Sequence, residues 1–180
     1  MATQTLVAPE EYLKTSFEGP DCEYVEGELV ERGMPTYLHS KIQALLCILF
    51  GTLIKRYPIF VVTELRLALA PQHRYRIPDV CVFAGQEPTQ PIPDTPPLVA
   101  IEIASPNDRL SETLKKFDEY RHWGVEHIWL IDPVVKTFYT YDSTGLHPVP
   151  AFHLPQYSFQ ITLADLSRET TKSVHKSFSR

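Results

Sequence analysis

The sequence predicts an α/β (α+β) protein in which helices flank a mixed β-sheet. Three observations support this class: short apolar runs of strand length recur, a helix with apolar residues at helical spacing precedes them, and a second helix separates two of them. The order is helix, strand, strand, strand, helix, strand. Strands joined by such a helical crossover lie parallel in one sheet, so the sheet is expected to be mixed.

The chain is most simply one domain. Its 180 residues suffice to bury a core, and no linker or internal repeat divides them. Residues 1–38 are expected to form an N-terminal extension, with a short helix over 9–14 and a hairpin whose strands are 23–25 and 29–31. The polar residues 167–180 are expected to fray.

Composition excludes several classes of protein. With 43% hydrophobic and 22% charged residues the chain resembles an ordinary globular protein, and no apolar run approaches the roughly 18 residues that span a membrane. Cys22, Cys47 and Cys81 lack zinc-type spacing and are expected to be reduced thiols in a cytoplasmic protein. The net charge of -5 disfavours a general nucleic-acid-coating protein, but it allows a local basic patch.

The strongest helix is predicted over residues 39–57, where apolar side chains recur at helical spacing. These positions are Ile42, Leu45, Leu46, Leu49, Leu53 and Ile54. Cys47, Ile48 and Phe50 lie off this stripe, so the helix is apolar nearly all round. Such a helix is buried on several sides, either at the centre of the fold or against a second subunit. The second reading predicts a homodimer.

Strands are predicted over residues 60–69, 79–84, 98–104 and 137–141, because these runs are rich in β-branched and aromatic residues. The proline-rich segment 88–97 is expected to be an exposed loop.

The second helix is predicted to run from Ser105 to Trp123. Ser105 has the character of an N-cap, Pro106 suits the first helical position, and Gly124 suits a left-handed end. The apolar run 127–132 then predicts the strand that returns parallel to the strand before the helix.

Glu102 is the one charged residue in the apolar run 98–104. Side chains alternate between the faces of a strand, so one face carries Val99, Ile101 and Ile103, and the other carries Ala100, Glu102 and Ala104. A buried carboxylate between two alanines is costly unless a basic side chain or a metal ion pairs with it. The sequence therefore implies a partner for Glu102.

A second carboxylate, Asp79, opens the preceding strand. Neighbouring strands lie about 4.8 Å apart, so Asp79 and Glu102 are expected to face one another. They repel unless a cation lies between them, and hard oxygen ligands of this kind suit Mg²⁺ or Mn²⁺. Alternatively, Asp79 is a loop residue after Pro78 without a chemical role.

The helix after Glu102 carries a candidate lysine. Its helical spacing places Lys116 at the edge of the buried stripe and Lys115 toward solvent. That stripe consists of Leu110, Leu114, Phe117 and Tyr120. Lys116 is therefore better placed to reach back over the sheet, although a lone helical lysine is more often a solvated charge.

Together these residues resemble the Uma-two family of restriction endonuclease-like proteins, within the PD-(D/E)XK nuclease superfamily. The resemblance covers nearly the whole chain and depends on the order of its motifs. These motifs are EYVEGEL at 23–29, Pro78-Asp79, Glu102, Lys116, YRHWGV at 120–125 and GVEHIWLIDP at 124–133.

This resemblance implies a restriction endonuclease-like fold that cleaves DNA. Asp79, Glu102 and the backbone carbonyl of Ile103 would hold Mg²⁺ or Mn²⁺. Lys116 would orient the attacking water or help to deprotonate it, and would offset charge on the phosphate. The superfamily's usual lysine, two residues after Glu102, is replaced here by Ala104.

Further residues are candidates for supporting roles. Glu64 interrupts one face of its predicted strand, and the resemblance implies that an early-helix residue, His39 or Gln43, also helps. Arg74 and Arg76 suit contacts with DNA phosphates, although a solvated hairpin turn fits them equally well.

Two functional hypotheses remain open at this point. One is a metal-dependent endonuclease acting on DNA, with RNA not excluded; the other is a nuclease fold retained as a DNA-binding or protein-assembly module. The acidic net charge and Ala104 favour the second. A purely structural salt bridge from Glu102 to Arg66 or Lys116 is the corresponding alternative for the site.

Overall fold

A six-stranded mixed sheet forms the centre of the protein in the computed structural model, which describes residues 6–16, 21–69, 74–106 and 108–167. In order across the sheet, its strands are β10 (Gly145–Val149), β9 (Thr137–Asp142), β8 (His127–Asp132), β7 (Val99–Ile103), β6 (Val80–Ala84) and β3 (Ile59–Thr63). β7 and β8 pair parallel, and the other neighbours pair antiparallel. The predicted mixed sheet and its crossover are confirmed.

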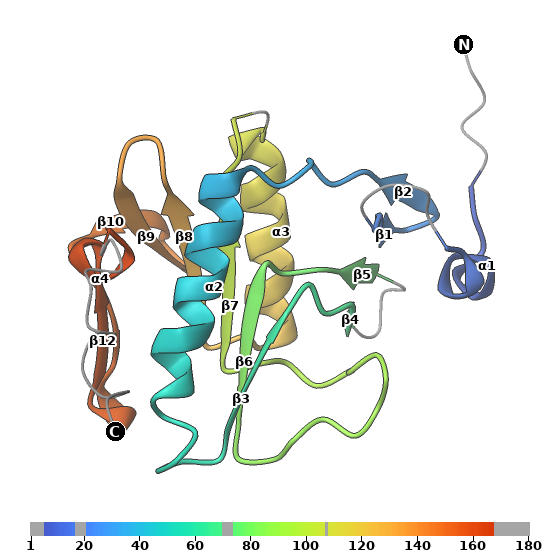
Figure 1. Cartoon of the computed structure of the whole chain (residues 1–180). Coiled ribbons are helices and arrows are strands. Elements are labelled where there is room, and N and C mark those ends of the chain that lie inside the picture. The colour runs from blue at the N-terminus through green and yellow to red at the C-terminus, as the bar shows by residue number, and fades with distance from the viewer. Residues whose placement is uncertain (1–5, 17–20, 70–73, 107, 168–180) are drawn as a thin grey trace, which may run out of the picture.

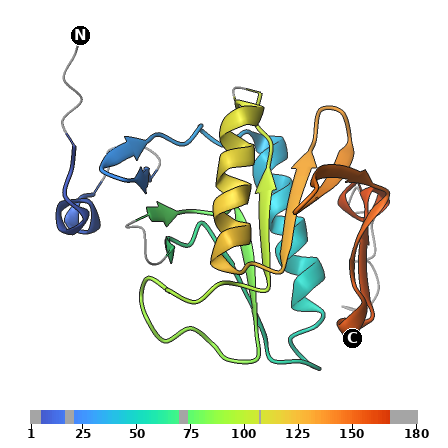
Figure 2. The ribbon, with the colours of Figure 1, turned by 180° about the vertical axis from the view of Figure 1, so that it is seen from behind.

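One helix covers each face of this sheet. Figure 1 shows α2 (Tyr37–Gly51) in front of the sheet, and Figure 2, viewed from behind, shows α3 (Leu110–Trp123) on the opposite face. Val99, Ile101 and Ile103 pack in the same core cluster as the buried side chains of α2, whereas Ala100 packs in the cluster of α3. The predicted alternation along β7 is confirmed, and it places Glu102 on the α3 face.

The N-terminal segment belongs to a second, four-stranded sheet beside the first (Figure 1). Its strands, in order, are β2 (Glu28–Val30), β1 (Glu23–Val25), β5 (Arg74–Arg76) and β4 (Leu67–Leu69). The short helix α1 (Pro9–Lys14) packs on it through Tyr12, whose ring stacks on Tyr24 at 5.0 Å. The predicted helix and hairpin both form, and pairing of β1 with β5 joins them to the rest of the chain.

The C-terminal elements were not predicted from the sequence. They are β11 (Ala151–Leu154), a 3-10 turn (Pro155–Tyr157), β12 (Phe159–Thr162) and α4 (Leu163–Ser167). Phe152 is fully buried between Trp129 and Phe138, with 4.3 Å between ring centroids on each side. This hairpin therefore completes the core on the α2 side.

The predicted strand over 60–69 is wrong as a single element. β3 ends at Thr63 and β4 begins at Leu67, and the two strands belong to different sheets. Between them Glu64 has a left-handed backbone with φ of 53°, which is uncommon for a residue with a side chain. The chain thus turns from one sheet to the other at Glu64.

The helix boundaries also differ from the predicted ones. α2 begins at Tyr37, with the Thr36 side chain accepting from the backbone of His39, and it ends at Gly51 instead of residue 57. α3 begins at Leu110 and not at Ser105, because the Ser105 amide donates to the Asp108 carboxylate in a turn.

The end of α3 agrees with the sequence. Gly124 has φ of 109°, and its amide donates to carbonyls of the last helical turn, as a left-handed cap requires. Residues 168–180, most of the segment predicted to fray, lie outside the described residues. Within the described ranges no helix is long and apolar enough to cross a membrane.

Truncation of Phe152 tests whether the C-terminal hairpin belongs to the core. Phe152→Ala is expected to lower the free energy of unfolding by about 3–5 kcal/mol, because it leaves a cavity between two stacked rings. Urea unfolding measures the loss. Val134→Ala, at a side chain that is 71% exposed, is the control, and a loss below about 1 kcal/mol for Phe152→Ala would contradict the packing.

Candidate active site

A cleft of about 920 Å³ opens where the two sheets meet α2 and α3. Asp79, Glu102 and Lys116 all line it. So do the other predicted residues His39, Gln43, Glu64, Arg76 and Ile103. The fold therefore gathers side chains from the N-terminal hairpin, the α2 helix, both central strands and α3 around one opening.

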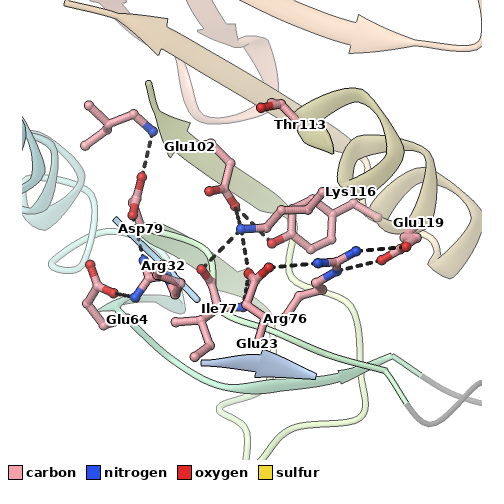
Figure 3. A network of polar contacts seen from close by, with 12 residues as sticks. Glu23, Arg32, Glu64, Arg76, Ile77, Asp79, Glu102, Thr113, Lys116 and Glu119 are labelled. Carbon is pink, nitrogen blue, oxygen red and sulfur yellow. Dashed lines mark hydrogen bonds and ion pairs between the residues drawn. The ribbon is translucent and has the colours of Figure 1, made fainter. Parts of the chain in front are cut away.

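The ammonium group of Lys116 lies between two carboxylates (Figure 3). Its Nζ is 2.6 Å from Glu23 Oε1 and 2.8 Å from Glu102 Oε1, and it donates to the Ile77 carbonyl at 3.4 Å. This is the orientation that helical spacing predicts. The Lys116 side chain is only 12% exposed, whereas Lys115 faces solvent. Three acceptors thus satisfy the three donors of the ammonium.

Glu102 has the polar partner that its sequence context requires. Besides Lys116, its Oε1 accepts a hydrogen bond of 3.0 Å from the Tyr120 hydroxyl. Burial raises the pKa of the Glu102 carboxyl; Lys116 opposes this rise, and repulsion from Asp79 and Glu23 adds to it. Asp79 and Glu102 line the same cleft.

Glu23 lines the cleft, but the sequence did not single it out. It is buried, and its Oε1 also accepts from the Ile77 amide at 2.9 Å, while its Oε2 accepts from Arg76 at 2.8 Å. Burial opposes its charge, but Lys116 and Arg76 together lower the pKa of Glu23 to about 2. Glu23 is therefore a carboxylate that holds Lys116 from the side opposite Glu102.

Arg76 is buried and forms ion pairs within the fold. It is 7% exposed, and it forms a bidentate pair with Glu119 of α3 through Nε at 2.7 Å and a terminal nitrogen at 2.9 Å. Its burial argues against the predicted contact with a DNA phosphate. Arg74 pairs with Glu26 at 2.5 Å, and its phosphate contact stays a prediction.

Asp79 forms the other half of the site, just before β6. Its Oδ2 accepts from the Ile103 amide at 2.7 Å and lies 3.1 Å from His39 Nε2, and its Oδ1 accepts from Arg32 at 2.9 Å. The antiparallel pairing of β6 with β7 brings Asp79 beside Glu102, as predicted. Asp79 lies in the bend just before β6, so it is a loop residue as the alternative has it, but it is buried and fully paired; its chemical role stays a prediction.

The predicted accessory residues gather around Asp79. Gln43 donates to the Asp79 carbonyl at 2.8 Å and to Glu64 Oε1 at 2.7 Å, and Arg32 bridges Glu64 to Asp79. His39 adds a third contact from α2. The sequence missed Arg32, which lies in an irregular link where no periodicity indicates the direction of a side chain.

Arg66 and Lys116 were the two predicted salt-bridge partners of Glu102, and the structure pairs Glu102 with Lys116. Arg66 lies elsewhere: it reaches Asp21 at 3.4 Å, and its guanidinium stacks 4.6 Å from the centre of the Tyr12 ring. The Glu102–Lys116 ion pair itself is present. An ion pair is compatible with catalysis as well as with a purely structural role.

The residues around the cleft also bear on a metal ion. Within the described ranges, no three side chains of His, Cys, Asp or Glu are grouped so as to hold a metal by themselves. Mg²⁺ commonly uses one or two carboxylates together with water and substrate phosphates, so a pair such as Asp79 and Glu102 fits this ion by donor chemistry. A backbone oxygen such as that of Ile103 suits the same ion.

The fold and the cleft define a restriction endonuclease-like α+β protein. A model of the Uma2 family, described as "Putative restriction endonuclease", matches residues 9–163, and the chain belongs to this family. The suggested resemblance to the Uma-two family is thereby confirmed.

A solved structure shares the fold. It is a protein from Anabaena variabilis ATCC 29413, described as "a putative nuclease belonging to DUF820". The similarity covers 89% of this chain and 97% of that chain, with a TM-score of 0.77 and 24% identity. No curated protein matches the sequence significantly.

Acid titration tests the position of Glu23. Its pKa is about 2 in the folded protein against an ordinary 4.5, so its ion pairs stabilise the fold fully above about pH 4.5 and are lost as pH falls from 4.5 toward 2. The contribution is about 3 kcal/mol at most. The stability advantage of wild type over Glu23→Gln is therefore expected to shrink between pH 5 and pH 3.

Urea unfolding across this pH range measures that advantage. Glu26→Gln removes an exposed carboxylate of the same hairpin, and it is expected to differ from wild type by less than about 1 kcal/mol throughout. A difference between wild type and Glu23→Gln that stays constant with pH would contradict the account.

Proposed function

We propose that this protein is a metal-dependent endonuclease that hydrolyses phosphodiester bonds in DNA. The observation that carries the proposal is the Lys116 ammonium, held against Glu102 in a cleft that also contains Asp79. A cation and two carboxylates line one cleft of about 920 Å³. The membership in the Uma2 family and the nuclease description of the Anabaena protein agree with this chemistry.

Asp79, Glu102 and the Ile103 carbonyl are the groups that we propose for Mg²⁺ or Mn²⁺. Both carboxylates line the cleft, and such oxygen donors suit a hard divalent ion. When bound, the ion supplies Lewis acidity to the phosphodiester and a lowered pKa to the attacking water.

The residues of the chain have distinct proposed roles. Burial lowers the pKa of the Lys116 amine, but Glu102 and Glu23 raise it by more, so this amine is protonated near neutral pH. A protonated lysine donates hydrogen bonds and offsets charge on a phosphate, so Lys116 is proposed to orient water and bind the phosphoryl oxygen. Glu23 is proposed to fix the position of the ammonium.

The alternative, a nuclease fold that binds DNA or assembles with protein without cutting, keeps one observation in its favour. Asp79 Oδ1 is already paired with Arg32, so one of the proposed ligands is engaged by the chain itself. Under this alternative the protein binds DNA or a protein partner, and metal leaves it inactive.

A homodimer is also proposed. α2 buries Ile42, Leu46 and Phe50 against the sheet, while Ile48 on its outer side is 66% exposed and Leu38 is 44% exposed. These outward apolar side chains suit contact with a second copy. The three cysteines are free thiols, which supports a proposed cytoplasmic location.

The mass in solution tests the dimer. Light scattering at micromolar concentration is expected to give twice the chain mass of 20.6 kDa, and Ile48→Glu is expected to shift it toward the monomer because a charge then enters the interface. A monomeric mass for wild type would contradict the dimer.

Plasmid nicking tests the enzyme. With Mg²⁺ or Mn²⁺, wild type is expected to nick supercoiled DNA, and Lys116→Met is expected to lower the rate by about 100-fold or more because it removes a charge from the reacting phosphate. Lys115→Met is the matched control, since that neighbouring side chain faces solvent and its loss should leave the rate unchanged.

A parallel series with Glu102→Gln and with RNA as substrate completes this experiment. Loss of nicking in Glu102→Gln supports the metal role, and cleavage of RNA alone would correct the substrate. Metal-independent or absent nicking by wild type would contradict the proposal and favour the binding module.

A further inference from the structure

Arg32 lies on the carboxylate that the proposed metal requires. It belongs to the link between β2 and α2, whose other residues, 31 and 33–36, are exposed. The Arg32 side chain is only 18% exposed and turns into the cleft, where Figure 3 shows it between Glu64 and Asp79. Its direction therefore differs from that of its neighbours.

The contacts of Arg32 occupy one side of Asp79. One terminal nitrogen pairs with Glu64, and the other donates to Asp79 Oδ1 at 2.9 Å. The second oxygen of Asp79 is already used by the Ile103 amide and His39. A cation that approaches Asp79 from the cleft thus meets the oxygen that Arg32 holds.

A guanidinium and a divalent ion exclude each other at this oxygen. Arginine keeps its charge in proteins, and Mg²⁺ binds oxygen at about 2.1 Å. Two cations on one carboxylate oxygen repel, and a partly buried cleft screens this repulsion less than water does.

Arg32 reaches the cleft from an exposed link. Its side chain is long, Met34 on the same link is 73% exposed, and a Cβ added at Gly33 would meet no atom within 4 Å. Release of the guanidinium would leave the rest of the cleft in place, since Asp79 keeps its contacts with Ile103 and His39.

We propose that Arg32 is a built-in competitor of the divalent ion, which neutralises Asp79 and Glu64 until the ion binds and displaces it. Arg32 then sets the metal concentration at which the site loads. This inference rests on the proposed function, because it presumes that Asp79 is a metal ligand. A purely structural Arg32 would instead support Asp79, so its loss would weaken metal binding.

Calorimetric titration of Mn²⁺ into chelator-stripped protein tests the proposal. Arg32→Met is expected to bind Mn²⁺ at least about tenfold more tightly than wild type. Arg109→Met is the matched control: it removes the same charge from the same cleft, but its side chain is 79% exposed and pairs with Glu112, not Asp79. Its affinity is expected to stay within about threefold of wild type.

A second variant and a second measurement keep the proposal testable if Arg32→Met does not fold. Arg32→Lys keeps the charge but lacks the planar fork that spans Asp79 and Glu64, and it is expected to bind Mn²⁺ more tightly than wild type by a smaller factor. Mn²⁺ should also raise the melting temperature of Arg32→Met more than that of wild type.

The outcomes separate the two claims. Equal or weaker Mn²⁺ binding by Arg32→Met, or by Arg32→Lys if the first variant fails to fold, would overturn the competition and leave the metal site standing. An equal gain in Mn²⁺ affinity for Arg109→Met would overturn it as well, since the loss of any positive charge near the cleft would then explain the effect. Absence of Mn²⁺ binding in every protein, wild type included, would overturn the metal site and this inference with it.

Discussion

The buried ammonium of Lys116, shared between Glu23 and Glu102, is the interaction on which the rest of the site depends. It joins the N-terminal hairpin to the central strand β7 and the helix α3, which both lie much later in the sequence. Charges removed from water are costly unless each one is paired, and removal of one partner leaves the others uncompensated. The geometry of Glu102 therefore depends on residues that arrive from three parts of the fold.

This constraint extends outward from Lys116 through a chain of alternating charges. Glu23 also binds Arg76, and Arg76 binds Glu119 in a bidentate pair on the same helix that carries Lys116. The second sheet is thus fixed to α3 by ion pairs from Arg76 and Glu23. The N-terminal hairpin therefore supplies part of the cleft, through Glu23.

The opposite end of the cleft is arranged differently. Asp79 and Glu64 are neutralised by Arg32, which comes from an exposed link and not from a packed helix. Lys116 is therefore held by packed elements, whereas Arg32 comes from an exposed link. This difference is what the proposed displacement of Arg32 by a divalent ion requires.

Periodic features of the sequence were sufficient for part of this picture. Strand alternation placed Glu102 between two alanines on the α3 face, helical spacing separated Lys116 from Lys115, and strand adjacency brought Asp79 to Glu102. These predictions depend on local geometry, which repeats every two or every 3.6 residues.

The remainder depended on contacts without periodicity. Glu23 reaches Lys116 only because β1 pairs with β5, a long-range pairing that no local pattern reveals. Arg32 lies in an irregular link, and Glu64 turns the chain through a left-handed conformation that split a predicted strand. Arg76 lies in a charged segment whose sequence suggests an exposed hairpin turn. It is nevertheless buried, because it pairs with Glu23 and Glu119.

Crystals soaked in Mn²⁺ and measured at the manganese absorption edge would locate the proposed ion. We expect an anomalous peak between Asp79 and Glu102, with the Lys116 ammonium still beside Glu23. Anomalous density at another place, or none at saturating Mn²⁺ with the cleft open to solvent, would contradict it.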